Sequence, residues 1–265
     1  MISHHRPQQP PSPEGLTYAD CMLRLCTIAL DVVNSRASPQ NSQRGLQRVE
    51  KQLQELVDIE IQAAPHLRDA VNCMSVRDHL EHWNWQLHHA YVISELCRPG
   101  LRRGEAEPSS LQSLRMRCVR ALVDTVDAFL GLQNVTSIAR LSWAAVHRAL
   151  SSALLLGILK EPAREPQVCA LLDRLVAVIS APDLAADSAE LPGPIARAVA
   201  ALTWLNSSED RLKGSWRTVM SAIDTQIDNQ LGSGGISNWS TPTTSNEGGS
   251  PHAQMQQILW GSSNM

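Results

Sequence analysis

Apolar residues recur with helical spacing along most of the chain, and this periodicity constrains the fold more than any other feature of the sequence. Three stripes with steps of three or four residues are Leu46, Val49, Leu53 and Leu56; Leu111, Leu114, Cys118, Leu122, Thr125 and Phe129; and Trp216, Val219, Ile223 and Ile227. Such spacing places side chains on one face of a helix, and no convincing run has the alternation of a strand. Further helices are expected at residues 17–34, 141–159, 166–180 and 194–205. The sequence therefore predicts an all-α fold, an irregular bundle of about eight helices.

The two ends of the chain differ in composition from its middle. Residues 1–15 are polar and rich in proline, and residues 232–265 are rich in Gly, Ser, Thr, Asn and Pro. Such segments cannot bury enough apolar surface to offset the entropy that ordering costs. We expect disorder at residues 1–15 and 232–265, flanking a helical domain at residues 16–231. No apolar run reaches the ~18 residues of a membrane-spanning helix, so no membrane partner is expected.

The segment HLEHWNWQLHHAYVISELCRP, from His79 to Pro99, concentrates histidine and tryptophan. On a helix its apolar residues cover most of the circumference. The polar strip that remains contains Glu81, Asn84, His88 and Glu95. A helix of this kind is covered by neighbours on nearly every side, so the pattern predicts the central helix of the bundle.

A metal site is the alternative interpretation of the same segment. His79 and His82 are three residues apart and could bind one ion, but His82 and His89 lie ~10 Å apart along a helix axis, too far for one tetrahedral centre. No third ligand is indicated elsewhere in the sequence. We therefore favour histidines that pack between helices and bind no metal.

No motif of an enzyme is present. The chain has no G-x-S-x-G elbow, no phosphate-binding glycine loop and no dinucleotide fingerprint. Carboxylate pairs such as Asp124 and Asp127 have the spacing of a solvated helix face. The six cysteines contain no C-x-x-C pair and are typical of reduced core residues, and the net charge of -3 does not favour nucleic acid. We expect no catalytic activity and no cofactor.

Three further segments follow one another between residues 80 and 205. WQLHHAYVISELCRPGL ends a helix in Arg-Pro, FLGLQNVTSIARLSWAAVHRALSSALLLGIL has Ser-Trp before a helix rich in Ala, Ser and Leu, and LPGPIARAVAALTWL contains Gly-Pro-x-Ala-Arg-Ala. In content, order and spacing they resemble the fungal-specific regulatory domain, the helical middle region of zinc-binuclear-cluster transcription factors. The residues singled out as structural are Trp83, Arg98, Pro99, Ser142, Trp143, Gly157, Gly193, Pro194 and Arg197. We expect Trp83 and Trp143 to be buried.

The resemblance implies a regulator of transcription that acts in the nucleus through coactivators or the transcription machinery. A second copy of the chain is another candidate partner, because Leu46 to Leu56 offers two weak heptads. The six-cysteine zinc cluster with which that family reads DNA does not occur in this sequence. The chain would then reach DNA only indirectly or through a separate N-terminal module, and zinc would enter only with that module. The alternative is an irregular α-helical adaptor unrelated to transcription.

Bulky apolar residues also occur near the C-terminus, within the polar tail. They are Met255, Ile258, Leu259 and Trp260. Apolar residues in a disordered segment can form a short helix on a partner. Residues 232–265 are therefore either a segment that activates transcription by binding another protein or a tail without a partner.

Overall fold

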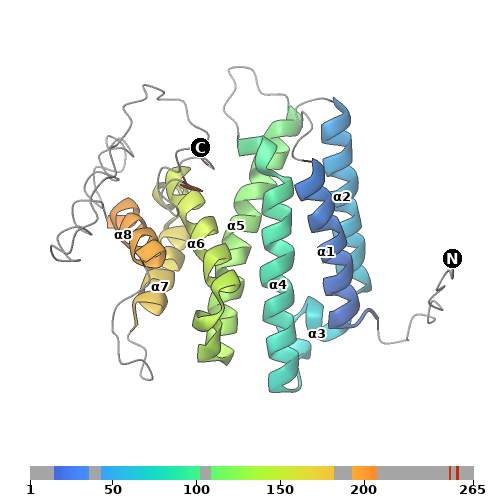
Figure 1. The fold of residues 1–265 in the computed structure, drawn as a ribbon, viewed down its shortest axis with the longest axis horizontal. Helices are drawn as coiled ribbons and strands as arrows, with labels where there is room; N and C mark the ends of the chain where they lie inside the picture. Colours follow the sequence, from blue (N-terminus) through green and yellow to red (C-terminus); the bar gives the residue numbers. More distant parts are fainter. Residues whose placement is uncertain are drawn as a thin grey trace.

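Two long helices, α4 (Val76–Leu96) and α5 (Ser109–Val135), run in opposite directions through the centre of the molecule (Figure 1). The computed structural model describes residues 15–35, 43–101, 109–181 and 193–207, together with residues 251, 255 and 256. These two helices pack against each other along their lengths, more extensively than any other pair of described elements. The prediction that residues 79–99 contribute the central helix is therefore confirmed.

The remaining helices lie on either side of this pair. On one side are α1 (Tyr18–Ser35) and α2 (Gln43–Gln62), with the single turn α3 (Pro65–Arg68) below them (Figure 1). On the other side are α6 (Trp143–Ile158), α7 (Pro166–Ser180) and α8 (Gly193–Ser207). Short 3-10 turns, η1 (Ala70–Asn72), η2 (Arg98–Leu101), η3 (Ser137–Leu141) and η4 (Glu161–Ala163), join them. The described residues thus form eight α-helices without a sheet, and the all-α prediction is confirmed; the stripe predicted at Trp216 to Ile227 lies outside them.

Local interactions explain where the central helices begin and end. Ser75 caps α4 by accepting a hydrogen bond from the backbone N–H of Asp78, whose carboxylate accepts one from the Ser75 N–H in return. After α4 the chain turns through Gly100, where an added Cβ would lie 2.5 Å from the backbone nitrogen of Arg115. Only glycine allows this approach, so Gly100 fixes how η2 packs against α5.

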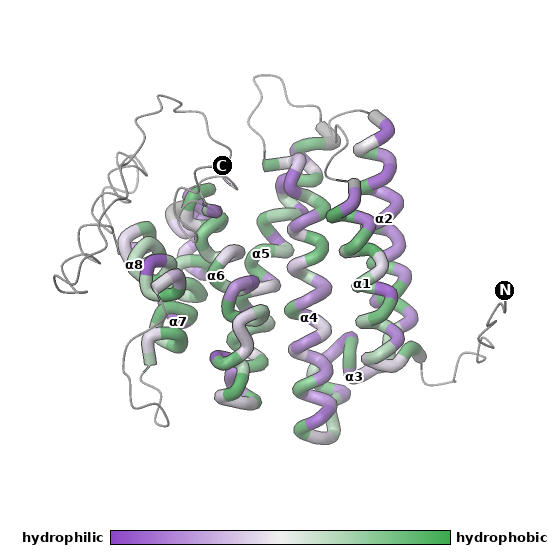
Figure 2. Tube along the Cα trace, in the orientation of Figure 1, coloured by the Kyte–Doolittle hydropathy of each residue, from purple (hydrophilic) through white to green (hydrophobic). Residues whose placement is uncertain are grey.

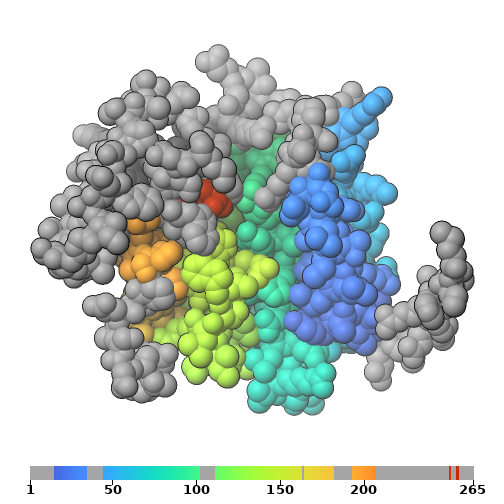
Figure 3. Space-filling model, viewed as in Figure 1, coloured from blue at the N-terminus to red at the C-terminus, as the bar shows by residue number. Residues whose placement is uncertain are grey.

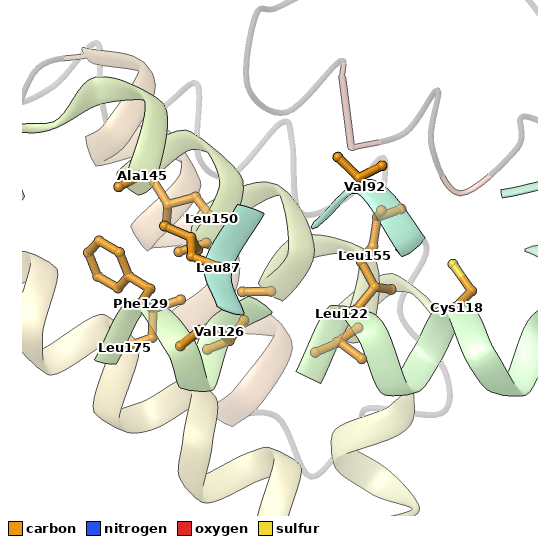
Figure 4. Close-up of a cluster of buried hydrophobic side chains, with 14 of the residues drawn as sticks. Leu87, Val92, Cys118, Leu122, Val126, Phe129, Ala145, Leu150, Leu155 and Leu175 are labelled. Carbon is orange, nitrogen blue, oxygen red and sulfur yellow. The ribbon is translucent and has the colours of Figure 1, made fainter. Parts of the chain in front are cut away.

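The apolar stripes meet in one continuous core. Leu87 and Val92 of α4 lie with Leu122 of α5 and Leu155 of α6 in the cluster drawn in Figure 4. The stripe predicted for the second helix joins the same core, because Val49, Leu53 and Leu56 are buried. These three residues are therefore not available as the seam of a coiled-coil dimer. Figure 2 shows that hydrophilic residues make up much of the remainder of α2.

Candidate functional site

The histidines of the central segment do not converge on one point. The Nδ1 atom of His82 lies 2.8 Å from the backbone oxygen of His66, within hydrogen-bonding distance. The His66 ring in turn lies 3.2 Å from a carboxylate oxygen of Glu81. Burial lowers the pKa of His82, although hydrogen bonds to the backbone of His66 and Leu67 act in the opposite direction. This end of α4 thus attaches α3 to the bundle. Among the described residues, no group of three or more His, Cys, Asp or Glu side chains is placed to hold a metal.

His89 is part of the core. Its ring stacks on the fully buried indole of Trp85, with 4.8 Å between the ring centroids and 20° between the planes. Burial lowers the pKa of His89 to about 4, although a hydrogen bond to the backbone of Leu56 opposes the shift. The ring is therefore neutral at pH 7 and acts as a flat packing residue.

The polar strip of α4, unlike His82 and His89, lies near polar side chains of α6. His88, Tyr91 and Glu95 are half-buried on α4, and the positive charge of Arg148 on α6 contributes to the lowered pKa of His88. Glu95 acts on His147 of α6 through its charge. Figure 3 shows α4 exposed between α6 and α1. We call the set Cys26, His88, Tyr91, Glu95, His147 and Arg148 the polar face.

Arg148 is the most distinctive member of the polar face. Its guanidinium carbon lies 5.3 Å from the centroid of the Tyr91 ring, a cation–π arrangement. Burial lowers the pKa of Arg148, while Tyr91 and the Cys26 thiol of α1 act in the opposite direction. Arg148 was not among the residues singled out from the sequence. The available signal was the basic pair His147-Arg148, which stands in a helix whose other residues are apolar or serine.

Trp143 is more exposed than the sequence predicts. It was expected to be a buried anchor, but 46% of its surface is exposed. It is the first residue of α6, directly after the capping residue Ser142, whose Oγ accepts a hydrogen bond from the Ala145 N–H at 3.4 Å. The indole lies 5.8 Å from the ring of His147 one turn later. Because it lies on the first turn of α6, it is less enclosed than the middle of the helix, and with His147 it forms an aromatic pair at this end of α6.

Trp83, the other tryptophan expected to be buried, is partly buried against the core. Its indole covers Gly131 of α5, where an added Cβ would lie 2.4 Å from the ring. The fully buried tryptophan of this helix is Trp85. Both indoles are on α4, and α5 approaches closely enough only because residue 131 has no side chain.

The other residues of the resemblance lie at helix joints and contacts. Arg98 forms an ion pair with Glu95 at the end of α4, and Pro99 is buried in η2. Gly157 lies where α6 meets α8, since an added Cβ would come within 2.8 Å of Leu205. Gly193 and Pro194 begin α8, with Gly193 exposed and without close neighbours, and Arg197 is half-buried one turn later. The structure spreads these residues over three helices and does not bring them together in a site.

The tail residues divide into two groups. Met255 is 1% exposed and belongs to the hydrophobic core, whereas a role in partner binding stays a prediction. Ile258, Leu259 and Trp260 lie outside the described residues. A long, flexible apolar side chain such as that of Met255 adapts easily to a core, and composition alone does not reveal this packing.

Comparison of the chain with known proteins finds no matching family model, no matching curated protein and no matching solved structure. None of the helices in the described ranges has both the length and the apolar character that crossing a bilayer requires. The functional interpretation therefore depends on the polar face and on the resemblance of the three segments.

Proposed function

We propose that this chain regulates transcription in the nucleus, as the effector-sensing part of a factor similar to the fungal zinc-cluster regulators. The carrying observation is that the three resembling segments supply α4, α6 and α8, three helices of one packed core. A regulatory domain needs a packed helical core of this kind, because binding at one of its surfaces must change the structure of another surface. The polar face, between α1, α4 and α6, is the candidate sensing surface.

The proposal assigns the chain a binding role and no catalysis. His88 is held neutral by burial and by the nearby guanidinium of Arg148, and Glu95 is engaged by Arg98. A general base would need a free carboxylate or a histidine with a pKa near 7. Half-buried groups of this kind are better suited to recognising a ligand than to transferring a proton.

The test is a fusion of the full chain to an unrelated DNA-binding domain in a fungal cell that carries a reporter gene. The fusion is expected to change reporter expression relative to the DNA-binding domain alone. Replacing Ile258, Leu259 and Trp260 together by Ala is expected to lower that output. This variant is preferable to deleting residues 232–265, because the deletion would also remove the buried Met255. A fusion that is silent in every nutrient condition would overturn the proposal.

A structural adaptor is the second candidate, and exposed apolar residues of α1 favour it. Leu23, Leu30 and Val33 are 64%, 63% and 59% exposed and recur at helical spacing. Exposed apolar stripes of this kind mark contact surfaces between proteins. Replacing all three by Ser separates the candidates, since an adaptor would lose its partner whereas the sensing function of the polar face would persist.

A further inference from the structure

The helix α1 carries two apolar stripes on opposite sides. The inward stripe is at most 6% exposed and consists of Cys21, Leu25, Ile28 and Val32. The second stripe, which we call the outward stripe, is exposed to solvent and consists of Leu23, Cys26, Leu30 and Val33. Since each residue turns a helix by about 100°, Leu30 lies roughly opposite its second neighbours Ile28 and Val32. The core therefore uses one side of α1 and leaves the other at the surface (Figure 3).

The outward stripe has the spacing of a coiled-coil seam. Its steps are three, four and three residues, as between the a and d positions of a heptad, where side chains pack against a second helix. The inward stripe has spacing of the same kind and packs in the core, where α1 lies against α4 and α2. The heptads of α2 are not available for such a contact, because Val49, Leu53 and Leu56 are buried. The helix suited to pairing with a further helix is therefore α1.

The residues that precede α1 are a poor occupant of this seam. Apart from proline, residues 1–15 contain Met1 and Ile2 as their only large apolar side chains, at the far end of a polar segment. A seam of four side chains needs a partner with apolar residues at matching helical spacing. The outward stripe of a second copy has this spacing, and a two-fold symmetric contact joins the same surface of two copies. A second copy of the chain is therefore the occupant that the observations favour.

The two flanks of the outward stripe determine the orientation of the second copy. One flank is polar, since Asp20, Thr27 and Asn34 are exposed there. The other flank is apolar, with Met22 and Ala29 half-buried. In an antiparallel pair of identical helices each flank meets the same flank of its partner, whereas in a parallel pair opposite flanks meet. The antiparallel pair thus joins polar side chains to polar ones and apolar side chains to apolar ones.

We propose that two copies of this chain form a dimer in which the outward stripes of α1 pair antiparallel. Leu23 of one copy packs against Val33 of the other, and Cys26 packs against Leu30, so that all four residues of each stripe are covered. The seam is about 15 Å long, so the dimer is expected to be weak and to depend on concentration. The inference goes beyond both candidate functions, because the purified chain would form the dimer whether it regulates transcription or acts as an adaptor.

The oligomeric state of the purified full chain is the first test. Sedimentation velocity over about 1 to 500 µM is expected to show a shift from the mass of one chain to that of two. Leu30→Glu places a charge in the seam on both copies and is expected to raise the dimer Kd about tenfold or more. Because Leu30 is 63% exposed, this variant is expected to keep the wild-type helix content by circular dichroism. Leu141→Glu is the matched control, since Leu141 of η3 is 70% exposed and lies outside α1.

Cross-linking tests the orientation of the two helices. In the antiparallel register Cys26 faces position 30 of the other copy, so Leu30→Cys is expected to form a disulfide between these two positions on oxidation with copper phenanthroline. Peptide mass spectrometry of the covalent dimer identifies the linked cysteines. The two wild-type Cys26 residues are offset by about 6 Å along the helix axis, so they are expected to cross-link much less. Leu30→Cys combined with Cys26→Ser is the control, because it removes the facing thiol.

Several results would overturn the proposal. One is a Leu30→Glu variant that dimerises as tightly as the wild type, and another is a wild type that cross-links mainly through its two Cys26 residues, as a parallel pair would. A wild type that stays a single chain throughout the range would also exclude the dimer. In that case alkylation of Cys26 shows what covers the stripe: a slow reaction indicates a segment of the same chain, and a fast one leaves the stripe open to a different protein.

Discussion

Acid is expected to unfold this protein through its buried histidines, and His89 allows the effect to be isolated. In the folded chain burial lowers the pKa of His89 from 6.5 to about 4. Protons then bind preferentially to the unfolded chain between pH 6.5 and pH 4, so the free energy of unfolding falls as the pH falls through this window. The stabilising contribution is fully present above pH 6.5 and is lost below pH 4.

The magnitude follows from the shift. Each pH unit by which the pKa is lowered corresponds to about 1.4 kcal/mol, and at pH 5 the unfolded ring is almost fully protonated while the folded ring is not. Between pH 7 and pH 5, His89 alone is thus expected to remove about 2 kcal/mol from the free energy of unfolding. His88, whose pKa is also lowered to about 4, adds a loss of similar size. Together these are a large part of the stability of an ordinary domain, which is about 5–15 kcal/mol.

Urea unfolding at pH 7, 6 and 5, followed by circular dichroism, measures the effect. His89→Phe keeps a flat ring against Trp85 and cannot be protonated, so it is expected to lose about 2 kcal/mol less than the wild type over this range. Val126→Ala is the matched control, because it destabilises the buried core of α5 but keeps both histidines and the full pH dependence. If the wild type and His89→Phe lose equal stability between pH 7 and pH 5, the burial argument is wrong.

Three further predictions concern packing and DNA. Trp85→Ala is expected to cost about 3–5 kcal/mol in urea unfolding, whereas Trp143→Ala is expected to cost under about 1 kcal/mol, because only the first ring is buried; equal costs would contradict the assigned burial. Gly131→Ala is expected to destabilise the chain by about 1–3 kcal/mol by displacing Trp83, and Trp83→Leu in the same chain is expected to recover part of the loss. The isolated chain is expected to show no sequence-specific DNA affinity at physiological salt, with only weak contacts that disappear as salt rises in a gel-shift titration.

The helices were predictable because they depend on local patterns. The stripe from Leu111 to Phe129 lies within α5, and the segment expected at residues 166–180 is α7. Periodicity, proline and capping residues act over a few positions, so they can be read without knowing the neighbours. The narrow polar strip containing His88 and Glu95 was also visible in the sequence.

Burial at helix ends and contacts between distant helices were not predictable. The Ser-Trp pattern placed Trp143 at the start of a helix correctly, but could not show that the indole would be 46% exposed there. Met255 reaches the core from a segment whose composition resembles a tail. The partner of the His88 strip is Arg148, about 60 residues away in sequence, and only the packing of α4 near α6 brings the two together.

The central claim is that this helical chain regulates transcription. The most direct test compares reporter expression from three fusions to an unrelated DNA-binding domain. They carry the wild-type chain, a variant in which Ile258, Leu259 and Trp260 are all replaced by Ala, and the control Arg120→Met, whose exposed arginine is paired with Asp124. We expect the wild-type and Arg120→Met fusions to change expression relative to the DNA-binding domain alone, and the triple-alanine fusion to accumulate to the same level but give a lower output. A wild-type fusion that is silent in every nutrient condition would contradict the claim.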